Sequence, residues 1–270
     1  MTEVHLAVPV IEVSGTGDPR LSDYRNIPDP DLLRSRGLFI AEGRQVVRRL
    51  LASPRFRVRS LLLTPAAHAG LADVLPCEPA VPVFIASQES MNAIAGFDIH
   101  RGCLAAGERP APARWQDVAA GATRLVVLEG VGNADNVGAI FRNAAAFGMD
   151  AVLLGPSCAD PLYRKAIRTS MGAALRIPFA PMEDWPADLA RLKALGVGLW
   201  ALTPSPDAQL LPHAGQPARL ALLVGHEGEG LSDAALGQAD LRVRIPMAEG
   251  VDSLNVATAA AIALYDLMRR

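Results

Sequence analysis

Short apolar runs alternate with helical segments throughout the second half of the chain. The apolar runs are 125–129, 151–155, 175–179, 197–202, 221–225 and 241–246, and the helical patterns between them centre on Ile140, Tyr163, Leu189, Leu236 and Ile262. Strands that are apolar on both faces and separated by helices predict a parallel sheet covered by helices. Ligands of such sheets bind at the carboxyl ends of the strands. The loops after Glu129, Gly225 and Ile245 are therefore the candidates for a functional site.

The first half of the chain predicts a smaller α/β unit. Segment 31–51 has helical spacing that is interrupted at Arg36-Gly37, which predicts two helical stretches. Segments 58–63, 81–86 and 102–107 predict strands, and Ser87 is placed to cap a short helix. A length of 270 residues favours two domains. We expect an N-terminal extension over 1–30, a small α/β domain over 31–106, a linker over 107–121 and a larger domain over 122–270.

Composition excludes several classes of protein. Half of the residues are hydrophobic and a fifth are charged, as in soluble globular proteins. No apolar run approaches the roughly 18 residues of a membrane span, and the first residues lack the pattern of a signal peptide, so we expect a cytoplasmic protein without a membrane partner. Three cysteines without a CxxC pair and five histidines without HxxxH spacing predict no metal site.

The charge of the chain is nearly balanced overall but not locally. The net charge is −2, whereas 20–59 contains ten arginines and four acidic residues. Guanidinium groups bind phosphates bidentately, so this segment could contact a nucleic acid. A solvated charged surface is the alternative that the same pattern allows.

The first candidate loop, 130–148, combines glycines with the start of a helix. Its GVG sequence resembles a dinucleotide-binding fingerprint, but Asp135 stands at the position of the third glycine, which weakens the assignment to a nicotinamide-dependent oxidoreductase. Asp135 or Asn136 is the predicted helix cap. Arg142 lies opposite the apolar stripe of this helix, as a solvated arginine does. A capped, glycine-bearing helix start also offers backbone N–H groups to an anion.

The second candidate loop, 224–236, has three glycines within six positions. Glycine allows a ligand to approach the backbone closely. Glu227 and Glu229 would repel a phosphate, so a neutral or cationic ligand suits this loop better. An ordinary turn into a helix capped by Ser232 is the alternative.

The third candidate segment, 245–270, leads into an alanine-rich helix. Asp252 or Ser253 is the predicted cap. Asn255 would then lie in the first helical turn, where asparagine competes with the helical hydrogen bonds. Simple capping by Ser253 and Asn255 is the alternative to a functional role.

These three segments together resemble a known family. DNVGAIFRNAAAFG, LLVGHEGEGLS and IPMAEGVDSLNVATAAAIALYD look like, in this order, the three motifs of the SpoU/TrmH family of RNA ribose 2′-O-methyltransferases in the SPOUT superfamily. The similarity extends from about Arg124 to the C-terminus. The segment with GLFIAEGRQVVRRLL and GCLAAG is more weakly similar to the ribosomal-protein-like RNA-binding domain that often precedes this catalytic domain.

The resemblance implies a fold, a cofactor and partners. The implied fold class is α/β, with a C-terminal trefoil-knotted methyltransferase domain built on a mostly parallel sheet and a small α/β RNA-binding domain before it. The implied cofactor is S-adenosyl-L-methionine, and the implied partners are ribosomal or transfer RNA and a second copy of the chain, paired through the knotted domain. We expect no metal.

The resemblance also implies site residues. The motif positions that correspond to the family's catalytic residues are Arg142, Asn136, Glu227, Ser253 and Asn255. Those that would contact the cofactor are Leu223, Val224, Gly225, Gly228, Gly230, Ile245, Met247 and Leu254. For the RNA we expect contributions from Arg44, Arg48, Arg101, Arg164 and Arg168. His226 departs from the family pattern, in which a small residue often precedes the glutamate, and predicts a local change in the pocket.

Arginine normally stays protonated. We therefore expect Arg142 to clamp a substrate phosphate rather than to act as a base. Asn136 and Asn255 would orient the site, Glu227 would position Arg142 or accept a proton, and Ser253 would support the loop. A non-catalytic RNA-binding or ribosome-assembly protein with the same fold remains an alternative, although the presence of all five motif residues favours an enzyme.

Overall fold

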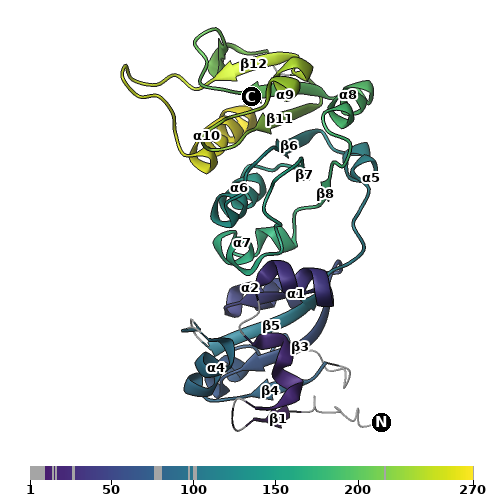
Figure 1. Ribbon diagram of the computed structural model, residues 1–270, viewed down its shortest axis with the longest axis vertical. Coiled ribbons are helices and arrows are strands. Elements are labelled where there is room, and N and C mark those ends of the chain that lie inside the picture. The colour runs from purple at the N-terminus through teal and green to yellow at the C-terminus, as the bar shows by residue number, and fades with distance from the viewer. Residues whose placement is uncertain are drawn as a thin grey trace. The chain divides into compact units, whose positions relative to one another are not determined.

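The computed structural model describes residues 10–13, 15, 17–25, 28–75, 81–96, 98–99, 102–215 and 217–269. The chain forms two compact units, one of Met1–Ala111 with Leu162–Arg176 and the other of Pro112–Pro161 with Ile177–Arg270. Figure 1 labels their helices and strands. Among the described residues, no helix combines the length and the apolar character that crossing a membrane requires.

The first unit is built on a five-stranded mixed sheet. The strand order is β1 (Val10–Glu12), β4 (Val83–Ile85), β3 (Arg57–Leu63), β5 (Cys103–Glu108) and β2 (Leu38–Glu42). β1, β4 and β3 run parallel, whereas β5 is antiparallel to both β3 and β2. The α-helices are α1 (Asp29–Arg36), α2 (Arg44–Leu51), α3 (Pro65–Ala69), α4 (Gln88–Ala95) and α7 (Arg164–Thr169), with 3₁₀ turns at Pro19–Tyr24 and Ala173–Leu175. Ser87 caps α4, as predicted.

The two helical stretches expected over 31–51 are confirmed as α1 and α2, but the expectation missed strand β2 between them. Gly37, at φ 62°, ends α1 in the left-handed conformation, and Gly43, at φ 94°, separates β2 from α2. All five β2 residues are buried and pair with β5. Burial on both faces erased the two-residue alternation that would have distinguished a strand from a helix.

The first thirty residues, expected to form an extension, contribute to the first unit where they are described. β1 pairs with β4, and Leu21 and Tyr24 are buried in the core. The Tyr24 hydroxyl and Ser60 Oγ form a hydrogen bond of 2.8 Å. Burial raises the pKa of Tyr24 well above its ordinary value. The described part of this segment therefore contributes to the core of the first unit.

The second unit contains the predicted parallel sheet. The order is β10 (Gln209–Leu210), β12 (Leu241–Arg244), β9 (Gly198–Leu202), β11 (Leu220–Val224), β6 (Arg124–Leu128), β7 (Ala151–Leu154) and β8 (Phe179–Pro181), and every neighbouring pair is parallel. The α/β fold class is thus confirmed. The strand predicted over 175–179 begins only at Phe179, because a 3₁₀ turn extends through Leu175 and the chain continues irregularly over 176–178.

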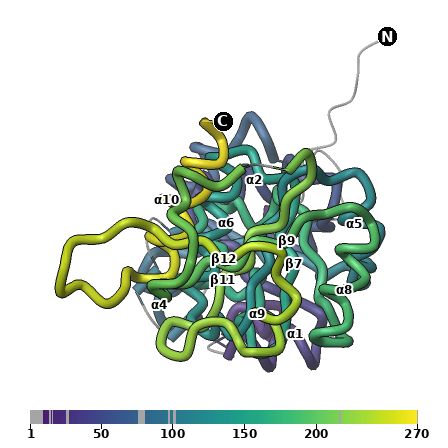
Figure 2. The backbone as a smooth tube through the Cα atoms, turned by 90° about the horizontal axis from the view of Figure 1, so that it is seen from above, coloured from purple at the N-terminus to yellow at the C-terminus, as the bar shows by residue number. Residues whose placement is uncertain are grey.

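Helices flank the second sheet and bring the C-terminal segment back to its middle. They are α5 (Trp115–Ala120), α6 (Ala134–Ala146), α8 (Ala187–Ala194), α9 (Asp233–Gln238) and α10 (Val256–Met268), with a 3₁₀ turn at Leu211–His213. After β12 the chain extends outward as the 245–255 loop, seen in yellow in Figures 1 and 2, and returns as α10. α10 packs against α6, where Asn143 Nδ2 donates to the Ala257 carbonyl at 3.0 Å.

Candidate active site

A cavity lies at the carboxyl ends of β9, β11 and β12. Its volume is about 150 Å³. Seven of the eight predicted cofactor residues line it, namely Val224, Gly225, Gly228, Gly230, Ile245, Met247 and Leu254. Leu202, at the end of β9, and Thr203 and Pro204, which follow it, also line the cavity.

Leu223 does not belong to this wall. Its side chain is fully buried in the apolar core of the second unit, where it packs with residues of β6 and β9. Successive strand residues point to opposite faces, and the neighbouring Val224 lines the cavity. The contact expected between the cofactor and the backbone at Leu223 stays a prediction.

The glycine-rich loop after β11 is closed tightly. His226 N–H donates to the Gly230 carbonyl at 2.9 Å, and Gly230 N–H donates to the His226 carbonyl at 3.0 Å. A Cβ at Gly225 would lie 2.3 Å from the Gly230 carbonyl carbon, and Gly230 has φ 75°. Glycine is required at position 225 because the backbone of the loop approaches closely there, and at position 230 because the backbone is in the left-handed conformation.

A buried carboxylate anchors the far end of this loop. Ser232 caps α9, as predicted, and its N–H and Oγ–H donate to Glu129 Oε2 at 2.9 Å and Glu129 Oε1 at 2.7 Å. Trp185 Nε1–H donates to Glu129 Oε1 at 2.7 Å. No sequence pattern singled out Glu129, which was predicted only as the last residue of an apolar strand. It ties the end of β6 to the loop.

Three predicted catalytic residues from separate loops form one hydrogen-bonded series. Asn136 Nδ2 donates to Glu227 Oε1, and Asn255 Nδ2 donates to Asn136 Oδ1 at 3.1 Å. Both ends of the Asn136 amide are thereby used, which fixes its orientation. Glu227 and Ser253 also line the cavity. The series therefore lies at the edge of the cavity, where a ligand and a second reactant can meet.

The residues that cap α6 and α10 differ from those predicted, and this difference explains how Asn136 and Asn255 take part in the hydrogen-bonded series. α6 is capped by Asn133 rather than by Asp135 or Asn136. α10 is capped by Asn255 rather than by Asp252 or Ser253, and Asn255 Oδ1 accepts from the N–H groups of Ala257 at 3.0 Å and Thr258 at 3.2 Å. The Asn136 side chain is therefore not used as a helix cap and bonds to Glu227 and Asn255 instead, whereas the Asn255 side chain both caps α10 and donates to Asn136.

Arg142 lies on α6 with its side chain exposed, as predicted. Among the described residues, none forms a hydrogen bond or ion pair with its guanidinium. The structure thus does not place Glu227 against Arg142, because the recorded partner of Glu227 is Asn136. An unpaired, exposed guanidinium is available to an anionic ligand.

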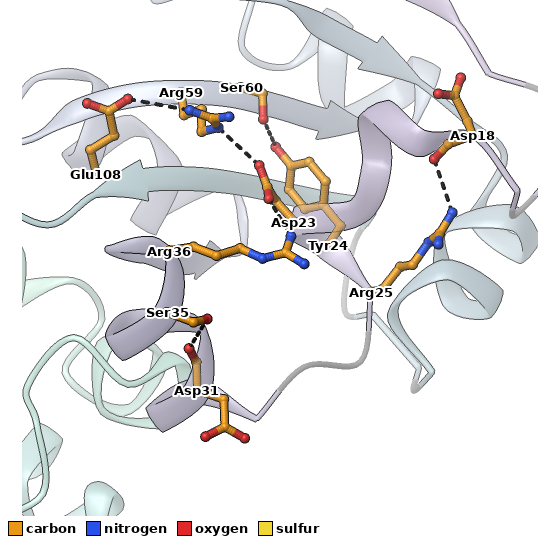
Figure 3. A network of polar contacts seen from close by, with 10 residues as sticks. All are labelled: Asp18, Asp23, Tyr24, Arg25, Asp31, Ser35, Arg36, Arg59, Ser60 and Glu108. Carbon is orange, nitrogen blue, oxygen red and sulfur yellow. Dashed lines mark hydrogen bonds and ion pairs between the residues drawn. The ribbon is translucent and has the colours of Figure 1, made fainter.

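Acidic neighbours pair with several arginines of the first unit. Asp23 lies between Arg36 and Arg59, at 2.7 and 3.1 Å (Figure 3). Arg48 pairs with Asp73 at 2.6 Å. These pairs reduce the positive surplus that the sequence suggested for 20–59.

The other predicted RNA-contacting residues have different surroundings. Arg44 and Arg168 line one cavity of the first unit together with the buried Glu42, whose Oε2 lies 3.7 Å from Arg168. The Arg164 backbone N–H donates to Asp29 at 2.9 Å. Arg101 lies outside the described residues.

Cysteine and metal chemistry find no support in the described part of the chain. Burial raises the pKa of Cys103 to about 12 and that of Cys158 to about 11, so both thiols are protonated near neutral pH. Within the same residues, no group of three histidine, cysteine or acidic side chains is arranged to hold a metal ion.

Comparisons with known proteins agree on one family. Residues 123–265 match the family model described as the SpoU rRNA Methylase family. An uncharacterized tRNA/rRNA methyltransferase of Mycobacterium tuberculosis is 48% identical over 267 residues, covering 96% of this chain and 92% of the relative. The 23S rRNA (guanosine(2553)-2′-O)-methyltransferase of Bacillus subtilis is 28% identical, covering 95% and 98%.

The fold is shared with solved structures as well. The AdoMet-bound rRNA methyltransferase of Sinorhizobium meliloti superposes with a TM-score of 0.82 at 23% identity, over 96% of this chain and 98% of that one. This likeness concerns the fold of the whole chain, the first unit included.

Proposed function

Because this chain belongs to the SpoU rRNA methylase family, we propose that it transfers the methyl group of S-adenosyl-L-methionine to a ribose 2′-hydroxyl of ribosomal or transfer RNA. The observation that carries the proposal is the Glu227–Asn136–Asn255 series at the edge of the glycine-walled cavity. The 2′-O-methyltransferase of Bacillus subtilis, named above, supports the choice of a ribose oxygen.

The cavity residues suit S-adenosyl-L-methionine. The backbone at Gly225, Gly228 and Gly230 allows close approach, while Ile245 and Leu254 give apolar surface for a flat base. Glu227 and Glu229 disfavour a phosphate but tolerate a positive charge. The cofactor supplies a methyl group on a positively charged sulfur and carries no phosphate, in agreement with this lining.

Arg142 is proposed to bind the RNA phosphate next to the reacting ribose. Its guanidinium is exposed and stays protonated at neutral pH, so it can neutralise negative charge that develops on the 2′-oxygen. In the proposed step the S–CH₃ bond breaks as the O–CH₃ bond forms, and the 2′-hydroxyl proton leaves to solvent water rather than to Arg142, which is already protonated. Asn136, oriented at both ends, is proposed to fix the ribose, and Glu227 to hold Asn136. Ser253 supports the cavity wall.

Substitutions at Asn255 should separate its two roles. Asn255→Asp keeps an oxygen that caps α10 but loses the Nδ2 donor to Asn136, so the unfolding midpoint should stay within about 2 °C while methyl transfer falls at least tenfold. Asn255→Ala should lose activity and also about 1 kcal/mol of stability. Thermal unfolding and initial rates of label incorporation measure both. Full activity of Asn255→Asp would show that Asn255 is only a cap.

A homodimer through the second unit is proposed from the surface of α10. Ile262, Tyr265 and Met268 are 40%, 47% and 51% exposed and recur at helical spacing, so they form an apolar face. Phe147, which follows α6, extends this face through an edge-to-face contact with Tyr265.

A charge on this face should dissociate the dimer. We expect Ile262→Asp to convert a dimer to a monomer in size-exclusion chromatography with light scattering, because an unpaired carboxylate would be buried. Leu195→Asp, at a residue that is 43% exposed on the C-terminal side of α8, is the matched control and should leave the dimer intact. A wild-type monomer, or a dimeric Ile262→Asp protein, would contradict the assignment.

The first unit is proposed to bind RNA, with Arg44 and Arg168 in its shared cavity as contacts and Arg48, Arg101 and Arg164 as further contacts. We also propose that, along the chain, 31–106 is the RNA-binding domain, 107–121 the linker and 122–270 the catalytic domain, although 162–176, which carries Arg164 and Arg168, packs within the first unit. The alternative, a ribosome-assembly protein without catalysis, would bind RNA but transfer no methyl group.

Incubation of labelled S-adenosyl-L-methionine with total RNA from a strain that lacks the gene tests the proposal. We expect label in the RNA fraction from the wild-type protein. RNA binding without any incorporation, in RNA that no other enzyme has premodified at the site, would favour the assembly role. Protection against thermal unfolding by S-adenosyl-L-methionine and not by NAD would exclude the nicotinamide-dependent alternative.

A further inference from the structure

The loop that bears Glu227 is held from within by the side chain of His226. The His226 Nδ1 atom accepts hydrogen bonds from the backbone N–H groups of Gly228 at 3.0 Å and Glu229 at 3.1 Å. The backbone of His226 is also paired in both directions with Gly230. Four hydrogen bonds therefore converge on one residue of a five-residue loop, and two of them depend on the imidazole.

These contacts determine which nitrogen of the ring carries the proton. A nitrogen that accepts two N–H bonds needs its lone pair, so Nδ1 is unprotonated. In the neutral ring the proton then lies on Nε2. His226 is a cavity-lining residue, and its Cβ would lie 3.1 Å from a Cβ added at Gly130. The ring is thus confined between the loop and the end of β6, and in this tautomer it is a hydrogen-bond donor rather than a base.

We propose that His226 is a positioning residue, whose Nδ1-bonded imidazole fixes the loop so that Glu227 reaches Asn136 and Gly225 to Gly230 keep the shape of the cofactor wall. Glu227 lies between His226 and the two N–H groups that His226 binds, so its backbone is restrained on both sides. This inference rests on the proposed function of the cavity. It explains why a large polar residue can stand where the family pattern often has a small one.

A set of three variants tests the role of Nδ1 in cofactor binding. Asparagine places its Oδ1 at the same number of bonds from Cβ as histidine Nδ1, whereas glutamine places its oxygen one bond farther out. By calorimetry with S-adenosyl-L-methionine and the full chain, we expect His226→Asn to bind within about threefold of wild type. His226→Ala and His226→Gln should bind about tenfold more weakly, because two backbone N–H groups lose their acceptor.

Non-specific destabilisation of the loop by each substitution would not produce this order of affinities. If His226→Asn binds as weakly as His226→Ala, the Nδ1 acceptor is not the relevant feature, and the proposal is overturned. Unchanged binding by His226→Ala also overturns it. Rescue by asparagine and not by glutamine, with equal unfolding midpoints for the two variants, supports it.

Two further readouts do not depend on the cofactor. Long-range ¹H–¹⁵N correlation should show His226 as the Nε2–H tautomer, identified among the five histidines by its loss in His226→Asn. Amide exchange at Gly228 and Glu229 should be slow in wild type and His226→Asn but about tenfold faster in His226→Ala. An Nδ1–H tautomer, or equal amide exchange rates in all three proteins, refutes the proposed role of His226 Nδ1. If the wild type shows the Nε2–H tautomer and slow amide exchange but binds no S-adenosyl-L-methionine, the proposed function fails, while the role of His226 in holding the loop stands.

Discussion

Arg142→Ala is expected to reduce methyl transfer by about 10³-fold while leaving the unfolding midpoint unchanged. The side chain is exposed on α6 and makes no hydrogen bond or ion pair with any described residue, so its removal costs little folding free energy. Its loss removes the one charge proposed to neutralise the ribose oxygen. Single-turnover rates with saturating cofactor, together with thermal unfolding, measure the two effects.

Two further variants test whether the effect depends on the guanidinium of Arg142. Arg142→Lys keeps a positive charge but not the two-pronged geometry, so we expect an intermediate rate. Arg114→Ala removes another exposed arginine of the second unit and should behave as wild type. Turnover by Arg142→Ala at more than a tenth of the wild-type rate would remove Arg142 from the mechanism.

Gly225→Ala is expected to abolish cofactor binding, with a decrease in affinity of at least about 100-fold. The added methyl group would lie 2.3 Å from the backbone of Gly230 and Leu231, and backbone cannot swing aside as a flexible side chain can. The loop must therefore open, which also costs about 1–3 kcal/mol of folding free energy. Calorimetric titration and thermal unfolding report these two losses separately.

Gly237→Ala is the control for this substitution. No atom lies within 4 Å of a Cβ at that position, which is in α9, so alanine should leave binding unchanged and stability equal or slightly higher. Wild-type affinity in Gly225→Ala would mean that the 225–230 loop is not the cofactor wall.

The second sheet could be predicted from the sequence because two signals were present there, namely short apolar runs and helical segments between them. β6, β7, β9 and β11 are short apolar runs in a segment that also contains helices, and a parallel sheet buried on both faces requires that pattern. β2 was missed because its apolar residues are continuous with those of α2, and only Gly37 and Gly43 mark its ends. Two-residue β10 was too short for any periodicity.

Site residues were predicted from motifs, and their interactions were not. Asn136, Glu227 and Asn255 are separated by 119 positions at most, and only the fold shows that they form one series. Which asparagine caps a helix depends on where the helix starts, a boundary that sequence fixes only to within a few residues. Glu129 and the Nδ1 contacts of His226 had no recognisable pattern, since each is a side chain bonded to backbone or to a distant loop.

The arginines of the first unit illustrate a further limit of sequence reasoning. A count of charges cannot show which acids face them, and Asp23 alone contacts two arginines (Figure 3). The count over 20–59 already includes Asp23, whereas Asp73, which pairs with Arg48, lies outside that segment and lowers the charge that an RNA would meet. Exposed ion pairs of this kind contribute little to stability.

Alkaline hydrolysis of RNA labelled by the wild-type protein is the most direct test of the central claim, that three separate segments form one pocket for methyl transfer to a ribose oxygen. A 2′-O-methyl group blocks cleavage of the adjacent phosphodiester bond. We predict that the label is recovered in an alkali-resistant dinucleotide and is absent when Arg142→Ala is used. Label released as mononucleotide would place the methyl group on a base and contradict the account.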